Sequence, residues 1–257
     1  MTFAQQPVEL PLWPDGAPNS NGLTGGEKEV SPHRISNVTD PTITVYRAPQ
    51  PNGMAVIMCP GGGYSRLAMD HEGHDMASWF CGQGITYVVL KYRMPNGHCE
   101  VPLSDAERAI RIVREHAGEW NIHPRKIGIM GASAGGHLAS TLATHYSAAS
   151  RPDFQILFYP VISMLKGVTH GGSRKNLIGE LKHCCGFWTV TDGGGYPVIS
   201  AYPATAAAAL WDDARKAIRA GLVVAESKKM PGDTERVPTV VHLLTDDSLV
   251  VLTRDGG

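Results

Sequence analysis

Short runs of apolar residues recur along the chain and alternate with segments whose apolar positions repeat at helical spacing. The runs are nearly continuous, which is typical of strands buried on both faces of a parallel sheet; they lie at 43–46, 54–59, 85–92, 127–130, 154–161 and 239–244. Between the third and fourth runs lies an apolar stripe at i, i+3, i+4 and i+7 spacing, formed by Ala106, Ala109, Ile110 and Val113. Strands that alternate with helices predict an α/β fold with a mostly parallel central sheet and helices on both faces.

Local signals suggest where these elements begin. Ser104 precedes the stripe and Glu107 follows three residues later, so we expect a capping box that starts this helix at Ser104. A second helix is expected over 134–146, and a further one is possible over 210–224. Residues 1–40 are rich in Pro, Gly and Asn and predict an irregular arm on one large domain that spans 1–257.

Composition and charge narrow the classes of function. Apolar residues make up 42% and charged residues 18% of the 257 residues, which is ordinary for a globular protein. The formal net charge of −1 gives no electrostatic reason to expect nucleic acid or an anionic membrane as a partner. No apolar run approaches the roughly 20 residues that span a bilayer. The N-terminus lacks a basic segment followed by an apolar run, so we expect a cytoplasmic protein, or a secreted or periplasmic one if a leader is removed.

A serine stands between two glycines at the junction of an expected strand and an expected helix. Gly131-Ala132-Ser133-Ala134-Gly135 matches the G-x-S-x-G pattern of hydrolase nucleophiles. Such a turn is so sharp that its flanking positions tolerate almost no side chain, and glycine at both ends meets that need. The helix N-terminus also favours negative charge that develops beside Ser133. We therefore expect Ser133 to be a nucleophile; a purely structural glycine-rich turn is the alternative.

A second glycine-rich segment, Gly61-Gly62-Gly63, follows the strand expected at 54–59. Acyl transfer develops an oxyanion that needs pre-aimed backbone donors, and hydrolases supply them from such a loop. We assign these donors to the N–H of Gly62 or Gly63 together with the N–H of Ala134. A glycine turn or a phosphate-binding loop is the alternative, but neither G-x-G-x-x-G nor a Walker Lys-Ser/Thr is present. We therefore expect no nucleotide cofactor.

Two stretches contain residue types that bind metals. HEGHD, at 71–75, differs from the metalloprotease pattern H-E-x-x-H because Asp75 stands where the second histidine belongs. The potential ligands of HCC, at 183–185, are adjacent rather than spaced. We expect no metal site at either stretch.

Several long segments resemble the bacterial α/β-hydrolase carbohydrate esterases, the acetyl xylan esterase-like group allied to the feruloyl esterases. The matching segments are LWPDGAPN (12–19), CPGGGY (59–64), HEG (71–73), LKYRMP (90–95), VPLSDAERAIRIVREHA (101–117), GIMGASAGGHLAS (128–140), SRPDFQILFYPVIS (150–163) and THGGSRKNLIG (169–179). The resemblance runs nearly unbroken over 10–179. It implies an α/β-hydrolase fold, a Ser–His–Asp triad, no cofactor, and deacylation of small esters, acetyl esters of sugars or xylo-oligosaccharides above all.

The resemblance to this family is interrupted in the last third of the chain. It fails over 180–235 and returns at 236–251, where it places the triad acid at Asp247, with Asp246 as the near alternative. In this fold the order of the triad is Ser, Asp, His, and the family's histidine follows one more strand and helix. No histidine follows Asp247. We therefore expect the C-terminal strand, histidine loop and helix to be missing or divergent, in a truncated, frame-disrupted or diverged chain.

Other side chains are candidates for the substrate pocket or for a substitute base. His170 lies in the loop after the fifth apolar run, on the side of a parallel sheet where ligands gather, and is the best substitute base. In the resemblance that loop lies on the substrate side, so we expect substrate binding, more than catalysis, to be the role of His170. Tyr64 and Glu72 are further candidates for the pocket. We expect His137 and His242 to be structural, beneath the turn and in a buried strand.

These observations favour a serine carboxylesterase that acts on small-molecule or oligosaccharide esters. The alternative is a catalytically impaired or dead homologue that only binds carbohydrate, and a peptidase of the same fold stays open. An oxyanion hole alone retains roughly 10³–10⁴-fold catalysis over water, so weak activity without a histidine is compatible with either reading. An unpaired last strand would leave an exposed sheet edge, so a homo-oligomer is also expected.

Overall fold

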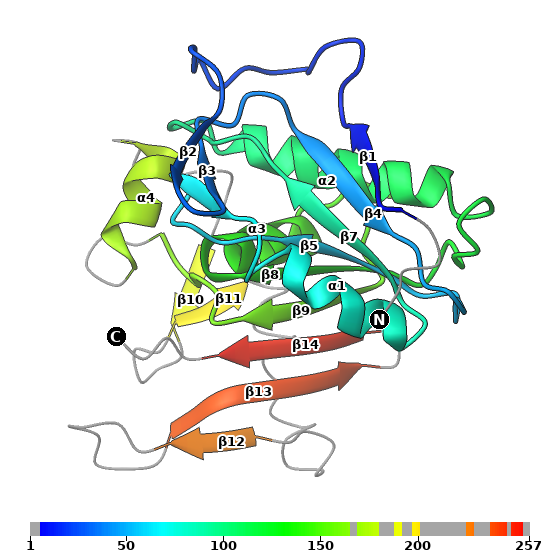
Figure 1. The fold of residues 1–257 in the computed structure, drawn as a ribbon. Helices are drawn as coiled ribbons and strands as arrows, with labels where there is room; N and C mark the ends of the chain where they lie inside the picture. The colour runs from blue at the N-terminus through cyan, green and yellow to red at the C-terminus, as the bar shows by residue number, and fades with distance from the viewer. Residues whose placement is uncertain are drawn as a thin grey trace.

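The computed structural model of the chain describes residues 6–164 and 169–179 with their side chains, and beyond them the backbone of five strands (Figure 1). The helices are η1 (His74–Met76, 3-10), α1 (Ala77–Gly82), α2 (Glu100–Glu115), α3 (Ser133–Thr144) and α4 (Gly171–Ile178). The strands up to residue 179 are β1 (Val8–Pro11), β2 (Lys28–Ser31), β3 (Arg34–Ser36), β4 (Thr42–Tyr46), β5 (Ala55–Cys59), β6 (Arg66–Ala68), β7 (Thr86–Lys91), β8 (Ile127–Ala132) and β9 (Phe154–Phe158). The later ones are β10 (Trp188–Thr191), β11 (Pro197–Ser200), β12 (Ala225–Lys228), β13 (Val237–Thr245) and β14 (Ser248–Thr253).

A six-stranded sheet in the order β1-β4-β7-β5-β8-β9 forms the centre of the molecule. Strands β7, β5, β8 and β9 are parallel, whereas β1 and β4 run antiparallel to their neighbours at one edge. Every residue of β5 and β8 is buried, as the continuous apolar runs predicted. The α/β-hydrolase fold class with a mostly parallel sheet is therefore confirmed.

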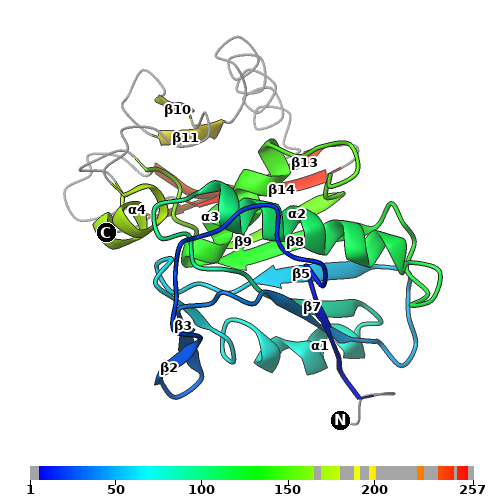
Figure 2. The same ribbon diagram turned by 90° about the horizontal axis from the view of Figure 1, so that it is seen from above.

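Helices cover both faces of this sheet. Figure 2 shows α2 and α3 on one face and α1 on the other. The predicted apolar stripe of α2 is wholly buried, because it packs against the sheet: Ala106, Ala109, Ile110 and Val113. None of the helices in the described part of the chain is both long and apolar enough to cross a bilayer.

The helix start predicted at Ser104 is wrong. Helix α2 begins at Glu100 with Cys99 as its N-cap, and the Ser104 hydroxyl inside the helix donates to the carbonyl of Val101 at 2.7 Å. The helix extends further because Pro102 falls in the first turn, where a backbone N–H has no intrahelical partner and a proline costs little. The capping box is therefore absent from this helix.

The N-terminal arm is also more regular than expected. Strand β1 pairs with β4 at the edge of the central sheet, and β2, β3 and β6 form a small antiparallel sheet. The arm is held down by a buried ion pair, in which Arg93 Nη2 lies 2.7 Å from Asp105 Oδ1. The indole N–H of Trp13 donates to Asp105 at 2.7 Å, and Arg93 Nη1 donates to the carbonyl of Asn19 at 2.6 Å. One buried charged pair thus fastens the arm to α2.

The later part of the chain is described only as strand backbone. Strand β13 confirms the run predicted as a strand at 239–244, and it pairs antiparallel with both β12 and β14. The helix suggested at 210–224 lies outside the described residues.

Candidate active site

The turn from β8 into α3 lifts Ser133 above the end of the central sheet. Its φ of 51° lies in the left-handed region, which for a non-glycine residue costs about 1–2 kcal/mol. The close packing explains the flanking glycines: a Cβ on Gly131 would collide with the carbonyl of Gly135, and one on Gly135 would collide with the carbonyl of Cys59. Glycine at these two flanking positions therefore leaves the room that the strained conformation of Ser133 requires. The turn has the geometry expected of a nucleophile elbow.

The loop Gly61–Gly63 leads from β5 to the same place. A Cβ on Gly61 would lie 2.9 Å from the Cβ of Ser133, so this loop touches the serine directly. Gly62 and Gly63 have φ values of 137° and 65°, conformations that side chains rarely adopt. Within the described residues neither the Gly62 nor the Gly63 N–H donates a hydrogen bond. Together with the Ala134 N–H in the first turn of α3, these amides are available to an oxyanion.

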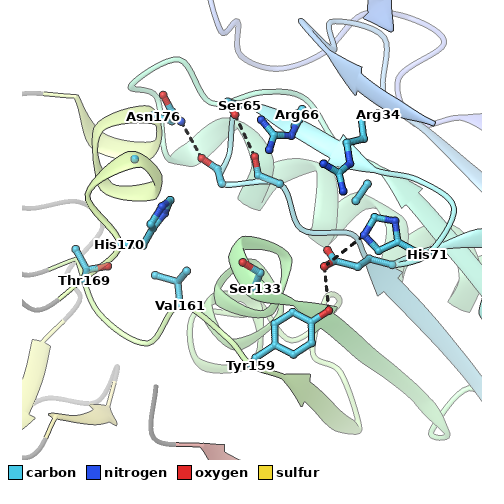
Figure 3. Close-up of a pocket in the computed structure, with 15 residues that line it drawn as sticks. Arg34, Ser65, Arg66, His71, Ser133, Tyr159, Val161, Thr169, His170 and Asn176 are labelled. Atoms are coloured by element: carbon cyan, nitrogen blue, oxygen red, sulfur yellow. Dashed lines mark hydrogen bonds and ion pairs between the residues drawn. The ribbon is translucent and has the colours of Figure 1, made fainter. Parts of the chain in front are cut away.

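A cavity of about 790 Å³ opens in front of Ser133 (Figure 3). It is bounded by the glycine loop, by the pair of strands β3 and β6, by the segment after β9, and by α4 with the residues just before it. Its described lining consists of Arg34, Gly62, Gly63, Ser65, Arg66, Ala68, His71, Glu72, Ser133, Tyr159, Val161, Thr169, His170, Gly172 and Asn176. Its volume falls in the range of small-molecule sites.

Glu72 lines this cavity, as its candidacy for the pocket predicted, and it also accepts a hydrogen bond from the glycine loop. Its Oε2 accepts the N–H of Gly61 at 2.8 Å, and its Oε1 accepts the hydroxyl of Tyr159 at 2.9 Å. Burial, followed by the hydrogen bond and the charge of Glu72, raises the pKa of Tyr159 to about 12. Tyr159 therefore stays neutral and donates to the carboxylate. The Glu72 side chain is only 14% exposed, so its bond to Gly61 is largely shielded from water, whereas its bond to Tyr159 lies at the surface.

His170 lines the same cavity as the N-cap of α4. Its Nδ1 accepts the backbone N–H of Ser173 at 3.2 Å and lies 2.9 Å from the Ser173 hydroxyl. Since Nδ1 acts as an acceptor, the proton of the neutral ring is on Nε2. A ring in this tautomer presents a donor to the cavity, whereas a general base needs an unprotonated nitrogen there. The geometry favours the binding role of His170 over the role of substitute base.

The placement of Tyr64 differs from the prediction. Tyr64 does not line the cavity: its ring is 2% exposed and its hydroxyl lies 2.8 Å from His137 Nδ1. The reason is its φ of 60°, which turns the side chain into the core beside Tyr92. His137 is structural, as expected, and burial lowers its pKa to about 3. These two residues support the turn from beneath.

The triad acid and base are not placed by the structure. Asp247 and its alternative Asp246 lie between β13 and β14, outside the described residues. His242 lies on β13, of whose side chains nothing is described. Within the part of the chain that carries side chains, the hydroxyl of Ser133 has no hydrogen bond to a histidine. Of the predicted catalytic groups, the described part of the chain thus brings together Ser133 and the amides of Gly62, Gly63 and Ala134.

Several cavity residues were not predicted from the sequence, and four of them carry large polar side chains that bear on the site. They are Arg34, Arg66, Tyr159 and Asn176, and the last donates from its amide to the carbonyl of Gly63 at 2.8 Å. Arg66 follows the glycine loop by three residues, which is a local signal that could have found it. The others come from segments whose approach depends on the tertiary fold.

Comparison with known proteins agrees with this geometry. Residues 43–165 match the family model BD-FAE. A curated acetylxylan esterase of Xylanibacter ruminicola is 49% identical over 130 residues, which are 51% of this chain and 27% of that protein. The endo-1,4-beta-xylanase B of Butyrivibrio fibrisolvens is 36% identical over 139 residues, 48% of this chain and 22% of that protein. The chain thus spans about a quarter of the length of these curated relatives.

A solved structure covers more of the chain. The acetyl ester-xyloside bifunctional hydrolase of Caldicellulosiruptor lactoaceticus has a TM-score of 0.55 and 36% identity, over 68% of this chain and 65% of that one. Its sheet order and these matches show that the chain has an α/β-hydrolase fold. The resemblance to the carbohydrate esterases, drawn above from sequence motifs, is confirmed by the BD-FAE match, the acetylxylan esterase and this structure.

Proposed function

We propose that this protein is a serine carboxylesterase that removes small acyl groups, acetyl above all, from sugars or xylo-oligosaccharides. The observation that carries the proposal is the strained Ser133 beside the unbonded amides of Gly62 and Gly63, at the wall of one cavity. Backbone strain of this kind persists where the surrounding structure enforces it, and it is concentrated at functional sites. The names of the acetylxylan esterase and of the acetyl ester-xyloside hydrolase support the choice of substrate.

The reaction follows from the placement of these groups. Ser133 Oγ attacks the ester carbonyl carbon, and the carbonyl oxygen becomes an oxyanion that accepts the N–H groups of Gly62 or Gly63 and of Ala134. Collapse of the tetrahedral intermediate expels the sugar hydroxyl and leaves an acyl group on Ser133, which water then removes. Asp247 is the proposed acid that orients the base of this reaction. The base itself is not assigned to a residue.

The test is hydrolysis of p-nitrophenyl acetate by the chain and by Ser133→Ala. The exposed Ser20, which is outside the cavity lining, gives the matched control Ser20→Ala. We expect Ser133→Ala to lose the enzymatic rate and Ser20→Ala to keep it. Equal rates for the chain and for Ser133→Ala would contradict the proposal.

The second candidate is an impaired homologue that binds carbohydrate without turning it over. It is favoured by the Ser133 hydroxyl, which has no histidine partner within the described residues. Binding of xylotriose, measured by calorimetry on a chain that hydrolyses no ester, would support this candidate. Hydrolysis that depends on Ser133 would exclude it.

A further inference from the structure

Two arginines stand side by side at the wall of the cavity. Strands β3 and β6 pair antiparallel, with Arg34 opposite Ala68 and Ser36 opposite Arg66. Arg34 and Arg66 therefore lie on the same face as diagonal neighbours, with Cβ atoms about 7–8 Å apart, within reach of long side chains. Both line the cavity that contains Ser133, and Figure 3 shows them on its far side from His170.

The register of the strands explains why both point outward. The alternate position Leu67 is fully buried in the core, so Arg66 and Ala68 on either side of it face the cavity. The small side chain of Ala68 leaves the space opposite Arg34 open. Arg66 is also tied to the glycine loop, because its backbone N–H donates to the carbonyl of Gly62 at 3.3 Å.

No carboxylate of the described residues forms an ion pair with Arg34 or Arg66. Other arginines of the chain, such as Arg93 and Arg108, lie within 4.0 Å of a carboxylate, whereas neither Arg34 nor Arg66 forms an ion pair or a side-chain hydrogen bond within the described residues. The two guanidinium charges repel each other, less strongly than a directly opposite pair would. Glu72, the carboxylate in the cavity lining, accepts its hydrogen bonds from Gly61 and Tyr159 rather than from either arginine. An anion from outside the chain would relieve this repulsion.

We propose that Arg34 and Arg66 form a subsite for a carboxylate carried by the sugar part of the ester, so that the preferred substrate is an acylated oligosaccharide with a uronic acid. Guanidinium groups bind carboxylates through two parallel N–H···O bonds, and this geometry makes arginine the usual carboxylate ligand. The subsite shares its cavity with Ser133, so one ligand can place its acyl group at the serine and its carboxylate at the arginines. This inference rests on the proposed function for the position of the acyl group.

The test measures binding, so that it does not depend on turnover. Ser133→Ala protein is titrated calorimetrically with xylotriose and with xylotriose that carries one glucuronic acid. We expect the acidic ligand to bind about 10-fold more tightly, with an advantage that shrinks as salt is raised. Adding Arg34→Gln and Arg66→Gln should remove the advantage. Arg125→Gln is the matched control, because Arg125 is exposed and lies outside the cavity lining.

Each outcome decides the proposal. Equal affinities for the two ligands, no binding of either, or an equal loss in Arg125→Gln would overturn it. Free glucuronic acid is titrated in parallel: binding as tight as that of the acidic oligosaccharide would show a site for free anions and would also overturn the substrate subsite. Hydrolysis of p-nitrophenyl acetate is measured separately on the unsubstituted chain, so failure of the esterase proposal and failure of the subsite are distinguishable.

Discussion

The carboxylate of Glu72 connects the glycine loop to Tyr159, and removing it tests how far the oxyanion donors depend on that connection. A hydrogen bond to a charged group contributes about 1.5–3 kcal/mol to stability. The bond to Gly61 is interior and adjacent to Ser133, whereas the Tyr159 ring is 58% exposed, so the second bond contributes less. We expect Glu72→Ala to destabilise the native conformation of the loop by about 2–4 kcal/mol.

This loss of loop stability should lower the rate of ester hydrolysis. If the amides of Gly62 and Gly63 stabilise the oxyanion, 2–4 kcal/mol corresponds to a fall of about 30- to 1000-fold in kcat/KM for p-nitrophenyl acetate. Glu72→Gln keeps an oxygen that accepts the Gly61 N–H but loses the charge, so we expect a smaller fall of about 10-fold. Tyr159→Phe removes only the outer bond and should have the smallest effect.

Steady-state kinetics on these variants, with exposed Glu119→Ala as the control, checks the expected order. A loosened oxyanion loop acts on the transition state, so the fall should be in kcat rather than in KM alone. Kinetics of Glu72→Ala equal to those of the control, or a raised KM with an unchanged kcat, would refute this role of Glu72. A second readout is the pKa of Tyr159, which should fall in Glu72→Gln because the neighbouring negative charge is gone.

Three further predictions concern the framework beneath the site. Asp105→Ala leaves Arg93 charged and buried, so the free energy of unfolding in urea should fall by about 3–5 kcal/mol, and a fall below 1 kcal/mol would contradict the role of this pair. Burial lowers the pKa of His137 from 6.5 to about 3. The neutral ring therefore contributes its full stabilisation above pH 6.5, and this contribution declines as the pH falls toward 3. In His137→Gln the difference in unfolding free energy between pH 7 and pH 4.5 should be smaller by about 2–3 kcal/mol. Gly135→Ala should cost about 1–3 kcal/mol through collision with the end of β5 and should slow labelling of the nucleophile; wild-type stability and labelling would contradict the steric argument.

Much of the fold could be predicted because its central strands are recognisable from their own residues. Strands β5, β7 and β8 are buried on both faces, so each is a continuous apolar run that stands out from the sequence. The nucleophile turn is similarly local, since Gly131 and Gly135 are required by contacts within one strand–turn–helix unit and its neighbouring strand. The buried strands and the strand–turn–helix around Ser133 could therefore be predicted from adjacent residues.

The rest depends on contacts between distant segments. Tyr159 meets Glu72 across 87 positions in the sequence, and Arg34 reaches the cavity only because β3 pairs with β6. Tyr64 is next to the glycine loop, yet a left-handed backbone turns it into the core, which composition does not reveal. The capping box at Ser104 failed because the helix continues through Pro102 to an earlier start. Tertiary packing decided the positions of Tyr159 and Arg34, whereas local backbone conformation decided those of Tyr64 and of the helix start.

The most direct test of the central claim is to find which residue reacts with a fluorophosphonate. The chain is incubated with the probe and digested, and the modified peptide is sequenced by mass spectrometry, with heat-unfolded protein as the control. We expect modification of Ser133 alone, in the folded chain alone, because only there do the oxyanion donors and the base that takes the serine proton act on one hydroxyl. Modification elsewhere, or no modification of the folded chain, would contradict the assignment of Ser133 as a working nucleophile.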